Sequence, residues 1–130
     1  MRTIIVDDSV FVRGCLIDIL SAIPDVEIIG KESEVYQAVA SIRLEEPDLV
    51  ILDIRLTCGS GIDVLHEIKH ANPDIKVIIF TGYPFLQYRR ECMEKGADAF
   101  LDKSNGFGHI KPIIQCLSSE AKRNGGRDEA

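Results

Sequence analysis

The sequence predicts an α/β fold, a doubly wound five-stranded parallel sheet with five helices, and three observations support this. Short apolar runs alternate with segments whose apolar residues recur at helical spacing. The runs lack the alternation of a half-exposed strand, as is typical of strands buried on both faces. Three of the joints contain Pro-Asp, which ends a helix and favours an extended chain. Short joints between strands and helices favour right-handed crossovers and therefore a parallel sheet.

Each of the five apolar runs is taken as one strand. The order 2-1-3-4-5 is expected for the sheet, which places the first and third strands on either side of the point where the strand order reverses. In such sheets, ligands bind beyond the carboxyl ends of the strands at that point. The strands are expected at residues 3–7, 25–30, 48–53, 75–80 and 98–102.

The segments between the strands are predicted helices. Ser9 is a suitable N-cap for the first of them, and Pro84 is acceptable in the first turn of the fourth. An interior proline costs about 3 kcal/mol, so Pro112 predicts that the fifth helix begins late, near 108–111. The helices are expected at 9–22, 34–45, 60–71, 84–95 and from this late start to about 121, and the polar residues 122–130 are expected to form a disordered tail beyond a domain of residues 1–121.

Composition limits the possible partners and compartments. The 130 residues suit one domain, and the net charge of −6 disfavours direct nucleic-acid binding. No apolar stretch approaches the roughly 20 residues that span a bilayer, so no membrane segment is expected. The chain begins with a strand-like run and no signal peptide, and the four cysteines have no metal-ligand spacing. A cytoplasmic protein with free thiols is therefore expected.

Polar residues stand where four of the strands end. Asp7 and Asp8 follow the first strand, Asp53 ends the third, Thr81 follows the fourth, and Lys103 follows the fifth. Because parallel strands share an edge at their carboxyl ends, these side chains should converge there. Close carboxylates repel one another, and Mg²⁺, which prefers oxygen ligands and commonly pairs with carboxylates and a phosphate, would relieve this repulsion. The sequence therefore predicts a magnesium site.

Asp53 is the best candidate for a chemical role at this edge. A carboxylate can be the nucleophile in phosphoryl transfer, giving an aspartyl phosphate. Asp53 lies centrally, whereas Asp7 and Asp8 form an adjacent pair suited to holding a metal. A strand-end aspartate alone is usually a turn former, so the prediction depends on the joint occurrence of polar residues at four strand ends.

The spacing of these residues resembles that of response-regulator receiver domains of bacterial two-component signalling, of the stand-alone, single-domain type. The resemblance covers residues 2–121. The matching positions form one spaced set: Asp7-Asp8, Asp53, Gly61 eight residues later, Thr81-Gly82, and Phe100 three residues before Lys103.

The resemblance implies a role for each matching residue. Asp53 would accept a phosphoryl group from a phosphohistidine on a sensor histidine kinase or a histidine phosphotransfer protein. Asp8, Asp53 and the main-chain carbonyl of Arg55 would hold Mg²⁺, with Asp7 acting mainly through water. The chain would catalyse only its own phosphorylation and dephosphorylation, and so would not be an enzyme in the usual sense.

The resemblance also implies a switch. Thr81 and Lys103 would contact the phosphoryl oxygens, and Phe100 would turn inward when Thr81 moves. The surface of the fourth helix, fifth strand and fifth helix would then bind an unknown downstream protein, or the phosphoryl group would pass along a relay. The kinase would contact the first helix and the loop after the fifth strand, where the chain offers Phe11, Cys15 and Phe107.

Two positions depart from the usual pattern of the family, and two others are positions where the family tunes the phosphoryl lifetime. Ser104 replaces the proline that usually follows the lysine, and Thr57 stands where proline is common. Arg55 and Tyr83, each two residues beyond Asp53 and Thr81, occupy positions that the family uses to tune phosphoryl lifetime. We hypothesise that these two large side chains restrict the attacking water and lengthen the lifetime.

Other functions remain open at this stage. One is a protein-interaction domain that works without phosphorylation, although the intact acidic set argues against it. Another is a Mg²⁺-dependent phosphohydrolase with an aspartyl nucleophile, which should carry an acid where Arg55 stands. His66 and His70, four residues apart in the third helix, could chelate a metal, but a solvated helix face is the preferred interpretation.

Overall fold

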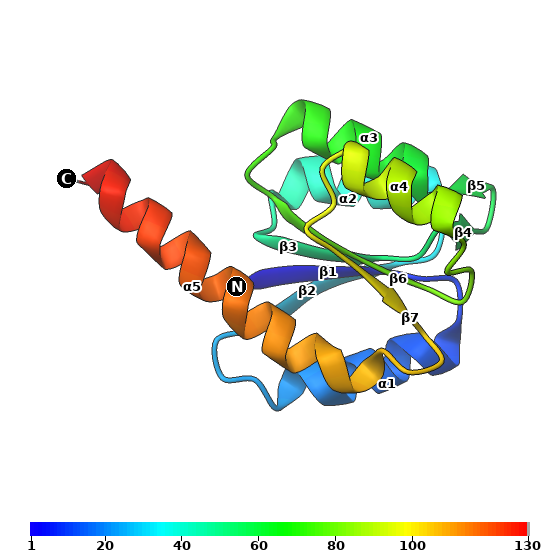
Figure 1. The fold of residues 1–130 in the computed structure, drawn as a ribbon, viewed down its shortest axis with the longest axis horizontal. Helices are drawn as coiled ribbons and strands as arrows, with labels where there is room; N and C mark the ends of the chain where they lie inside the picture. Colours follow the sequence, from blue (N-terminus) through cyan, green and yellow to red (C-terminus); the bar gives the residue numbers. More distant parts are fainter. Residues whose placement is uncertain (130) are drawn as a thin grey trace.

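The centre of the protein is a parallel five-stranded sheet with the predicted order. The computed structural model describes the backbone of residues 1–129 and the side chains of residues 1–120. The sheet has the order β2-β1-β3-β6-β7, which is the predicted 2-1-3-4-5 because β4 and β5 form a separate hairpin (Figure 1). Its strands are β1 (Arg2–Val6), β2 (Glu27–Glu32), β3 (Leu49–Leu52), β6 (Lys76–Thr81) and β7 (Ala99–Asp102).

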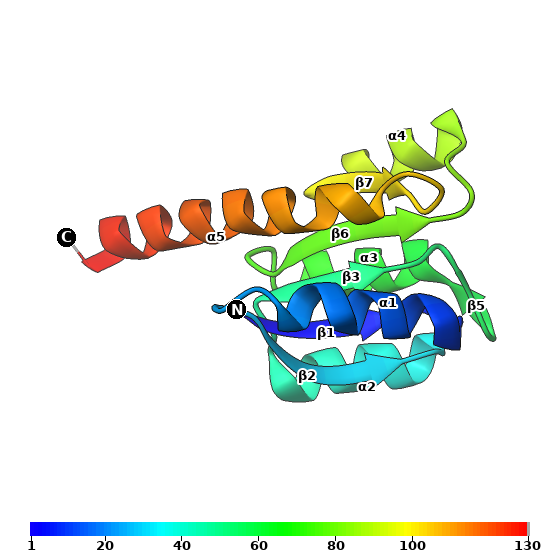
Figure 2. The same ribbon diagram turned by 90° about the horizontal axis from the view of Figure 1, so that it is seen from below.

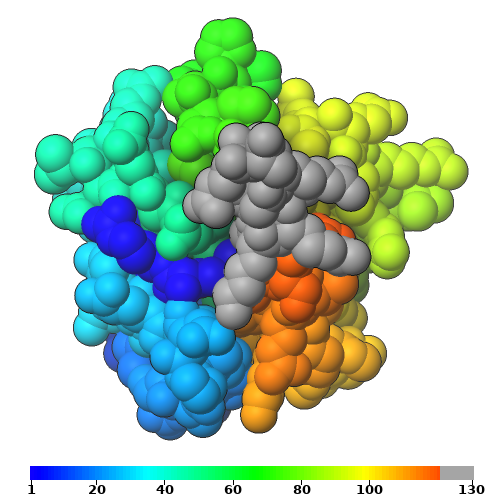
Figure 3. Space-filling model, turned by 90° about the vertical axis from the view of Figure 1, so that its left-hand side faces the viewer, coloured from blue at the N-terminus to red at the C-terminus, as the bar shows by residue number. Residues whose placement is uncertain are grey.

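Five helices cover the two faces of this sheet. One face carries α1 (Val10–Ser21) and α5 (Phe107–Glu129), and the other carries α2 (Val35–Glu45), α3 (Gly61–Ala71) and α4 (Leu86–Glu94) (Figures 1 and 2). Each face has its own apolar cluster, because alternate strand residues point to opposite sides. Figure 3 views the edge where the strands begin, and the colours run around it in chain order from α1 to α5.

The N-cap predicted for the first helix is confirmed. The Ser9 hydroxyl accepts a hydrogen bond from the Val12 amide at 3.2 Å, which satisfies one of the free amides at the helix start. The helix after β6 begins later than predicted. Phe85 is its N-cap in an extended conformation, so Pro84 precedes α4 instead of lying in its first turn.

The last helix differs from the prediction at both ends. It begins at Phe107, slightly before the expected 108–111, and includes Pro112 in its second turn. The connection between β7 and α5 is therefore residues 103–106. The backbone remains helical to Glu129, beyond the expected end near 121. The side chains of residues 121–129 and all of residue 130 lie outside the described part of the chain, so the division into domain and tail stays a prediction.

A small hairpin was not predicted. It pairs β4 (Arg55–Leu56) with β5 (Gly59–Ser60), directly after the site strand β3. Two-residue strands leave no apolar run to detect, and Cys58 adopts the left-handed conformation at φ 60°, where glycine or asparagine is usual. The hairpin matters because it orients Arg55 beside the acidic edge.

Two further expectations can be compared with the described residues. None of the described helices combines the length and apolar character needed to cross a bilayer. All four cysteines carry free thiols, as predicted. Cys92 is buried, and burial followed by the charge of Glu91 raises the pKa of its thiol to about 11, so this thiol is unreactive at neutral pH.

Candidate functional site

The predicted site residues meet at the carboxyl edge of the sheet. Asp7 and Asp53 directly follow β1 and β3, Thr81 ends β6, and Lys103 directly follows β7. Main-chain hydrogen bonds continue past the strands: the Asp53 amide donates to the carbonyl of Val6 at 2.9 Å, and the Lys103 amide donates to the carbonyl of Thr81 at 2.9 Å. The sheet therefore fixes the backbone of each functional residue.

One ammonium group bridges two buried carboxylates. The Lys103 Nζ lies 2.8 Å from Asp7 Oδ2 and 2.8 Å from Asp53 Oδ2. Asp7 is only 2% exposed and Asp53 only 4%. The other oxygen of Asp53 accepts a hydrogen bond from the amide of Ile54 at 2.7 Å. Asp53 thus lies at the centre of the cluster, in contact with the ammonium of Lys103, and the guanidinium of Arg13 donates to the main-chain carbonyl of Asp7 at 2.5 Å.

Burial and the close charges shift the pKa values of two residues in this cluster. Burial and the nearby charge of Asp53 raise the pKa of Asp7, although hydrogen bonds from Lys103 and the Ser9 amide oppose this. Burial acts to lower the pKa of Lys103, but its hydrogen bonds and charge interactions with Asp53 and Asp7 outweigh burial, and the net shift is upward. Lys103 is therefore charged at neutral pH, and burial disfavours the charged form of Asp7 despite the ammonium beside it.

The acidic cluster fits a hard divalent cation. Asp7, Asp8 and Asp53 each offer a carboxylate oxygen, and these oxygens all lie within 4.8 Å of one another. Oxygen donors at this spacing suit Mg²⁺, and a bound cation would oppose the upward shift that burial gives the pKa of Asp7. The main-chain carbonyl of Arg55 as a fourth ligand stays a prediction.

Gly61 allows α3 to approach the back of Asp53. A Cβ atom at position 61 would lie 1.8 Å from the main-chain oxygen of Asp53, far inside any van der Waals contact. The Gly61 amide also donates to the carbonyl of Ile54 at 2.6 Å. The glycine in the matching set is therefore required by a close backbone approach.

The two predicted switch residues have different environments. Thr81 is fully buried, and its hydroxyl accepts a hydrogen bond from the amide of Tyr83 at 3.0 Å. Phe100 is partly buried and packs on the cluster beneath α2, α3 and α4. The inward turn of Phe100 stays a prediction, since one conformation is described.

Arg55 and Tyr83 are in direct contact, which the sequence did not predict. The guanidinium carbon of Arg55 lies 4.0 Å from the centre of the Tyr83 ring, a cation–π contact. Arg55 comes from the hairpin after β3, whereas Tyr83 comes from the loop after β6. The contact therefore joins the two loops that follow Asp53 and Thr81.

Hydrogen bonds and ring packing hold the loop after Lys103, where proline is absent. The Asp102 side chain accepts a hydrogen bond from the amide of Ser104 at 2.9 Å, as in an Asx turn. Gly106 is buried against Phe80, and the Phe80 and Phe107 rings pack edge to face at 4.8 Å. The backbone described contains no cis peptide bond. Local hydrogen bonding thus shapes this loop without a proline.

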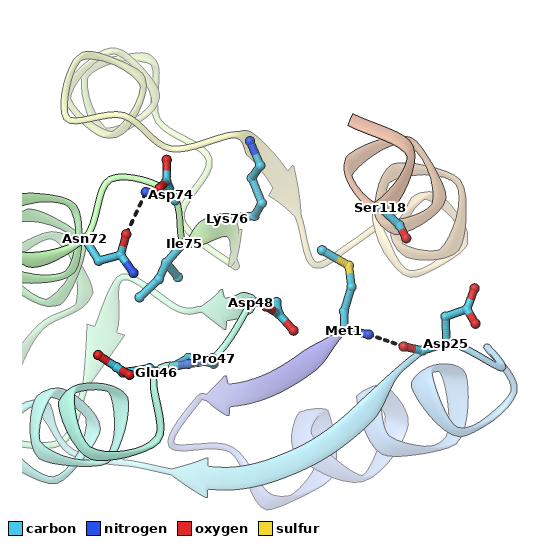
Figure 4. Close-up of a pocket in the computed structure, with 10 residues that line it drawn as sticks. All are labelled: Met1, Asp25, Glu46, Pro47, Asp48, Asn72, Asp74, Ile75, Lys76 and Ser118. Atoms are coloured by element: carbon cyan, nitrogen blue, oxygen red, sulfur yellow. Dashed lines mark hydrogen bonds between the residues drawn. The ribbon is translucent and has the colours of Figure 1, made fainter. Parts of the chain in front are cut away.

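A pocket of about 510 Å³ lies at the opposite edge, where the strands begin (Figure 4). Its lining includes Met1, Asp48, Asn72 and Lys76. None of the predicted site residues lines it. This pocket is therefore separate from the acidic cluster, which is recognised by its charges and by its place at the carboxyl ends of the strands.

Comparison with known sequences identifies relatives of different kinds. DevR/DosR, a DNA-binding transcriptional activator of Mycobacterium tuberculosis, is 30% identical over 103 residues, covering 79% of this chain and 48% of the relative. A protein-glutamate methylesterase/protein-glutamine glutaminase of Methanospirillum hungatei is 30% identical over 115 residues, covering 87% of this chain and 34% of the relative. The chain thus spans less than half the length of these relatives.

Solved receiver structures have the same fold. The signal receiver domain of a putative LuxO repressor from Vibrio parahaemolyticus matches with a TM-score of 0.85 and 26% identity, over 95% of this chain and 94% of that chain. A chain of the CheX–CheY–BeF₃–Mg complex from Borrelia burgdorferi matches with a TM-score of 0.83 and 26% identity, over 90% and 88% of the two chains.

The family match covers most of the chain. Residues 3–115 match the response regulator receiver domain. Receiver domains are generally signalling modules that accept a phosphoryl group, bind Mg²⁺ at an acidic pocket, and interact with histidine kinases or phosphotransfer proteins and with downstream effectors. The fold, the acidic cluster and the sequence match agree, and the chain belongs to the response regulator receiver domain family of two-component systems.

Proposed function

We propose that Asp53 of this chain accepts a phosphoryl group from a phosphohistidine of a histidine kinase or a histidine phosphotransfer protein. The carboxylate oxygen forms a bond to phosphorus while the bond between phosphorus and the imidazole nitrogen breaks, and the imidazole takes up a proton. The observation that carries this proposal is the buried Asp53 carboxylate held 2.8 Å from the Lys103 ammonium. A carboxylate so placed is available as a nucleophile and has a cation beside it.

The surrounding residues supply positioning and charge. Lys103, which bridges Asp7 and Asp53 before transfer, would contact the oxygens of the transferred group, and Thr81 would donate its hydroxyl to them. Asp7, Asp8 and Asp53 would hold Mg²⁺, with the Arg55 carbonyl as a further ligand. Bound there, the ion would neutralise charge that develops on the phosphoryl oxygens.

The proposal assigns two surfaces to partners. The kinase would meet α1 and the loop after β7, where Phe11 is 76% exposed and Phe107 is partly buried. The phosphorylated state would be read at α4, β7 and α5, where Phe85 and Leu86 are exposed and Phe100 would turn inward. An exposed apolar group of this kind is typical of a protein-binding surface.

A phosphate-affinity gel tests this proposal. The protein is incubated with acetyl phosphate and Mg²⁺, and Asp53→Asn is run beside it. We expect a shifted band in the wild type that Asp53→Asn lacks, because the amide cannot form the acyl phosphate. Asp74→Asn, an exposed acid on the opposite edge, should shift as the wild type does.

Other outcomes identify the alternative functions. Absence of a shifted band in the wild type would favour an interaction domain that works without phosphorylation. Rapid multiple turnover on phosphate esters would favour a phosphohydrolase, although Arg55 occupies the position where such an enzyme needs an acid and is engaged with Tyr83. Either result would refute Asp53 as a signalling phosphoacceptor.

We also expect Arg55 and Tyr83 to lengthen the phosphoryl lifetime. Their 4.0 Å contact places two large side chains beside the loops that follow Asp53 and Thr81, where they would obstruct an attacking water. A contact worth about 1 kcal/mol corresponds to about a fivefold change in rate. Decay of purified phosphoprotein should therefore be about fivefold faster in Arg55→Ala and in Tyr83→Ala.

The double variant tests whether the pair acts through its mutual contact. If it does, Arg55→Ala/Tyr83→Ala should decay little faster than either single variant, because each substitution already removes the contact. Arg90→Ala, an exposed arginine of α4, serves as the control. Unchanged decay in both single variants would contradict this part of the proposal.

A further inference from the structure

Two histidines on α3 form an exposed pair at the end of the sheet away from Asp53. The sequence His66-Glu67-Ile68-Lys69-His70 is helical throughout, so residues 66 and 70 lie one turn apart on the same face. Both side chains are exposed. Their rings lie nearly parallel, with an interplanar angle of 15° and centroids 6.2 Å apart. The two imidazoles are thus already directed to the same side of the helix.

The neighbouring lysine does not occupy the space beside the two imidazoles. The Lys69 ammonium is turned away, because it donates to the carbonyl of Ile75 at 2.7 Å and pairs with Asp98 at 3.1 Å. Within the described part of the chain, neither imidazole makes a hydrogen bond or ion pair. The pair also lies in the second half of α3, towards its C-terminus, where the helix dipole favours positive charge.

We propose that His66 and His70 together bind one first-row transition-metal ion of the class that imidazole prefers, such as Zn²⁺ or Ni²⁺. Two histidines at positions i and i+4 of a helix can present their nitrogens to a common point, and the two exposed rings would approach more closely than their present 6.2 Å centroid separation to share one ion. Water would complete the coordination.

The site differs from a peptidase centre despite its H-E-x-x-H spacing. In such enzymes the glutamate acts as general base beside the metal. Here the Glu67 carboxylate is held by Arg43 at 2.9 Å, and no histidine lines the neighbouring pocket between α2 and α3. We therefore expect the histidine pair to bind a metal ion without catalysing hydrolysis.

The site also differs from the magnesium cluster in its chemistry. The cluster at Asp53 offers three carboxylate oxygens, which suit Mg²⁺, whereas α3 offers two nitrogens, which suit softer ions. Excess Mg²⁺ should therefore fill the acidic cluster and leave the histidine pair available. This difference lets one titration report on α3 alone.

Isothermal titration of the full chain with Ni²⁺, in excess Mg²⁺ and without an added histidine tag, tests the proposal. We expect one ion per chain, with His66→Ala and His70→Ala each weakening binding at least about tenfold, because two-point chelation becomes single attachment. Zn²⁺ should bind the same residues. The ring NMR signals of His66 and His70 should shift or broaden, while that of His109 should not.

Two variants separate this site from others. His109→Ala, an exposed histidine of α5, and Asp53→Asn should both bind Ni²⁺ as the wild type does, so this result does not depend on phosphorylation. Equal binding by His66→Ala/His70→Ala and the wild type would overturn the proposal, as would loss of binding in Asp53→Asn. Thermal unfolding without metal checks that each variant is folded, which we expect because alanine favours the helix.

Discussion

Gly61→Ala should lower the free energy of unfolding by about 3 kcal/mol or more, at the upper end of the usual cost of inserting atoms into a packed interior. The added Cβ would lie 1.8 Å from the Asp53 oxygen. The Asp53 oxygen is a backbone atom and the backbone of residue 61 fixes the position of the Cβ, so no flexible side chain can move to make room. Relief requires α3 to move away from β3, which would also displace the Asp53 carboxylate. We therefore expect loss of phosphorylation together with loss of stability.

Urea denaturation and the acetyl phosphate gel together measure these effects. Gly14→Ala is the matched control, because Gly14 lies within α1 and a Cβ there meets no atom within 4 Å. That substitution should stabilise the protein by about 0.5–1 kcal/mol through helix propensity. A Gly61→Ala variant as stable as the wild type would show that α3 is not held against Asp53 as described.

The second large effect is expected from Lys103→Met. Removing the ammonium leaves Asp7 and Asp53 buried beside each other without their shared cation. Breaking a fully buried pair costs about 3–5 kcal/mol. Because the Lys103 side chain is 19% exposed, we expect a smaller loss, about 2 kcal/mol at neutral pH. The variant should also accept phosphoryl groups poorly, since it lacks the positive charge that faces them.

The pH dependence of this loss has a definite sign. The pKa of Asp7 is raised above its usual 3.8 in the folded protein, chiefly by burial. A raised acid pKa stabilises the fold at low pH, and this stability is lost as the pH rises through the folded value. Removing Lys103 removes interactions that lower this pKa, so it should rise further. The deficit of Lys103→Met relative to the wild type should therefore shrink as the pH falls from about 7 to 4.

Denaturation of both proteins across this pH range, with EDTA present, measures the deficit. Lys103→Met/Asp7→Asn should recover much of the stability at pH 7, because one of the two uncompensated charges is gone. Lys111→Met, an exposed lysine of α5, should show no such deficit. A deficit that is independent of pH would mean that lost packing, not charge, explains the effect.

The sheet could be predicted because its central strands contain continuous apolar runs. Val50, Ile51 and Leu52 are all buried, and no amphipathic helix produces such a run between two polar ends. Residue boundaries were less certain. Pro84 lies outside α4 and Pro112 lies inside α5, because proline fits several positions near a helix start and tertiary packing decides among them.

The charged part of the site could also be predicted, because strand topology brings residues together without any knowledge of packing. Asp7, Asp53 and Lys103 are in direct contact as expected. The contact between Arg55 and Tyr83 could not be foreseen. It depends on the β4–β5 hairpin, whose left-handed Cys58 has no sequence signal of the usual kind. Strand order thus predicts contacts between residues at strand ends, but not contacts between side chains on irregular loops.

The bond between the Lys103 amide and the Thr81 carbonyl has a mechanical consequence. This main-chain hydrogen bond holds the ends of β6 and β7 together. The hydrogen bond from the Asp53 amide to the Val6 carbonyl holds the ends of β3 and β1 together in the same way. The ladder between these two strand pairs ends earlier, at the Leu52–Ile79 pair. Beyond this ladder, the two strand pairs are linked by the Lys103 ammonium, which contacts the carboxylates of Asp7 and Asp53. A ligand that draws this ammonium away from Asp7 and Asp53 would loosen the strand ends beyond this ladder, while the ladder itself still joins β3 to β6.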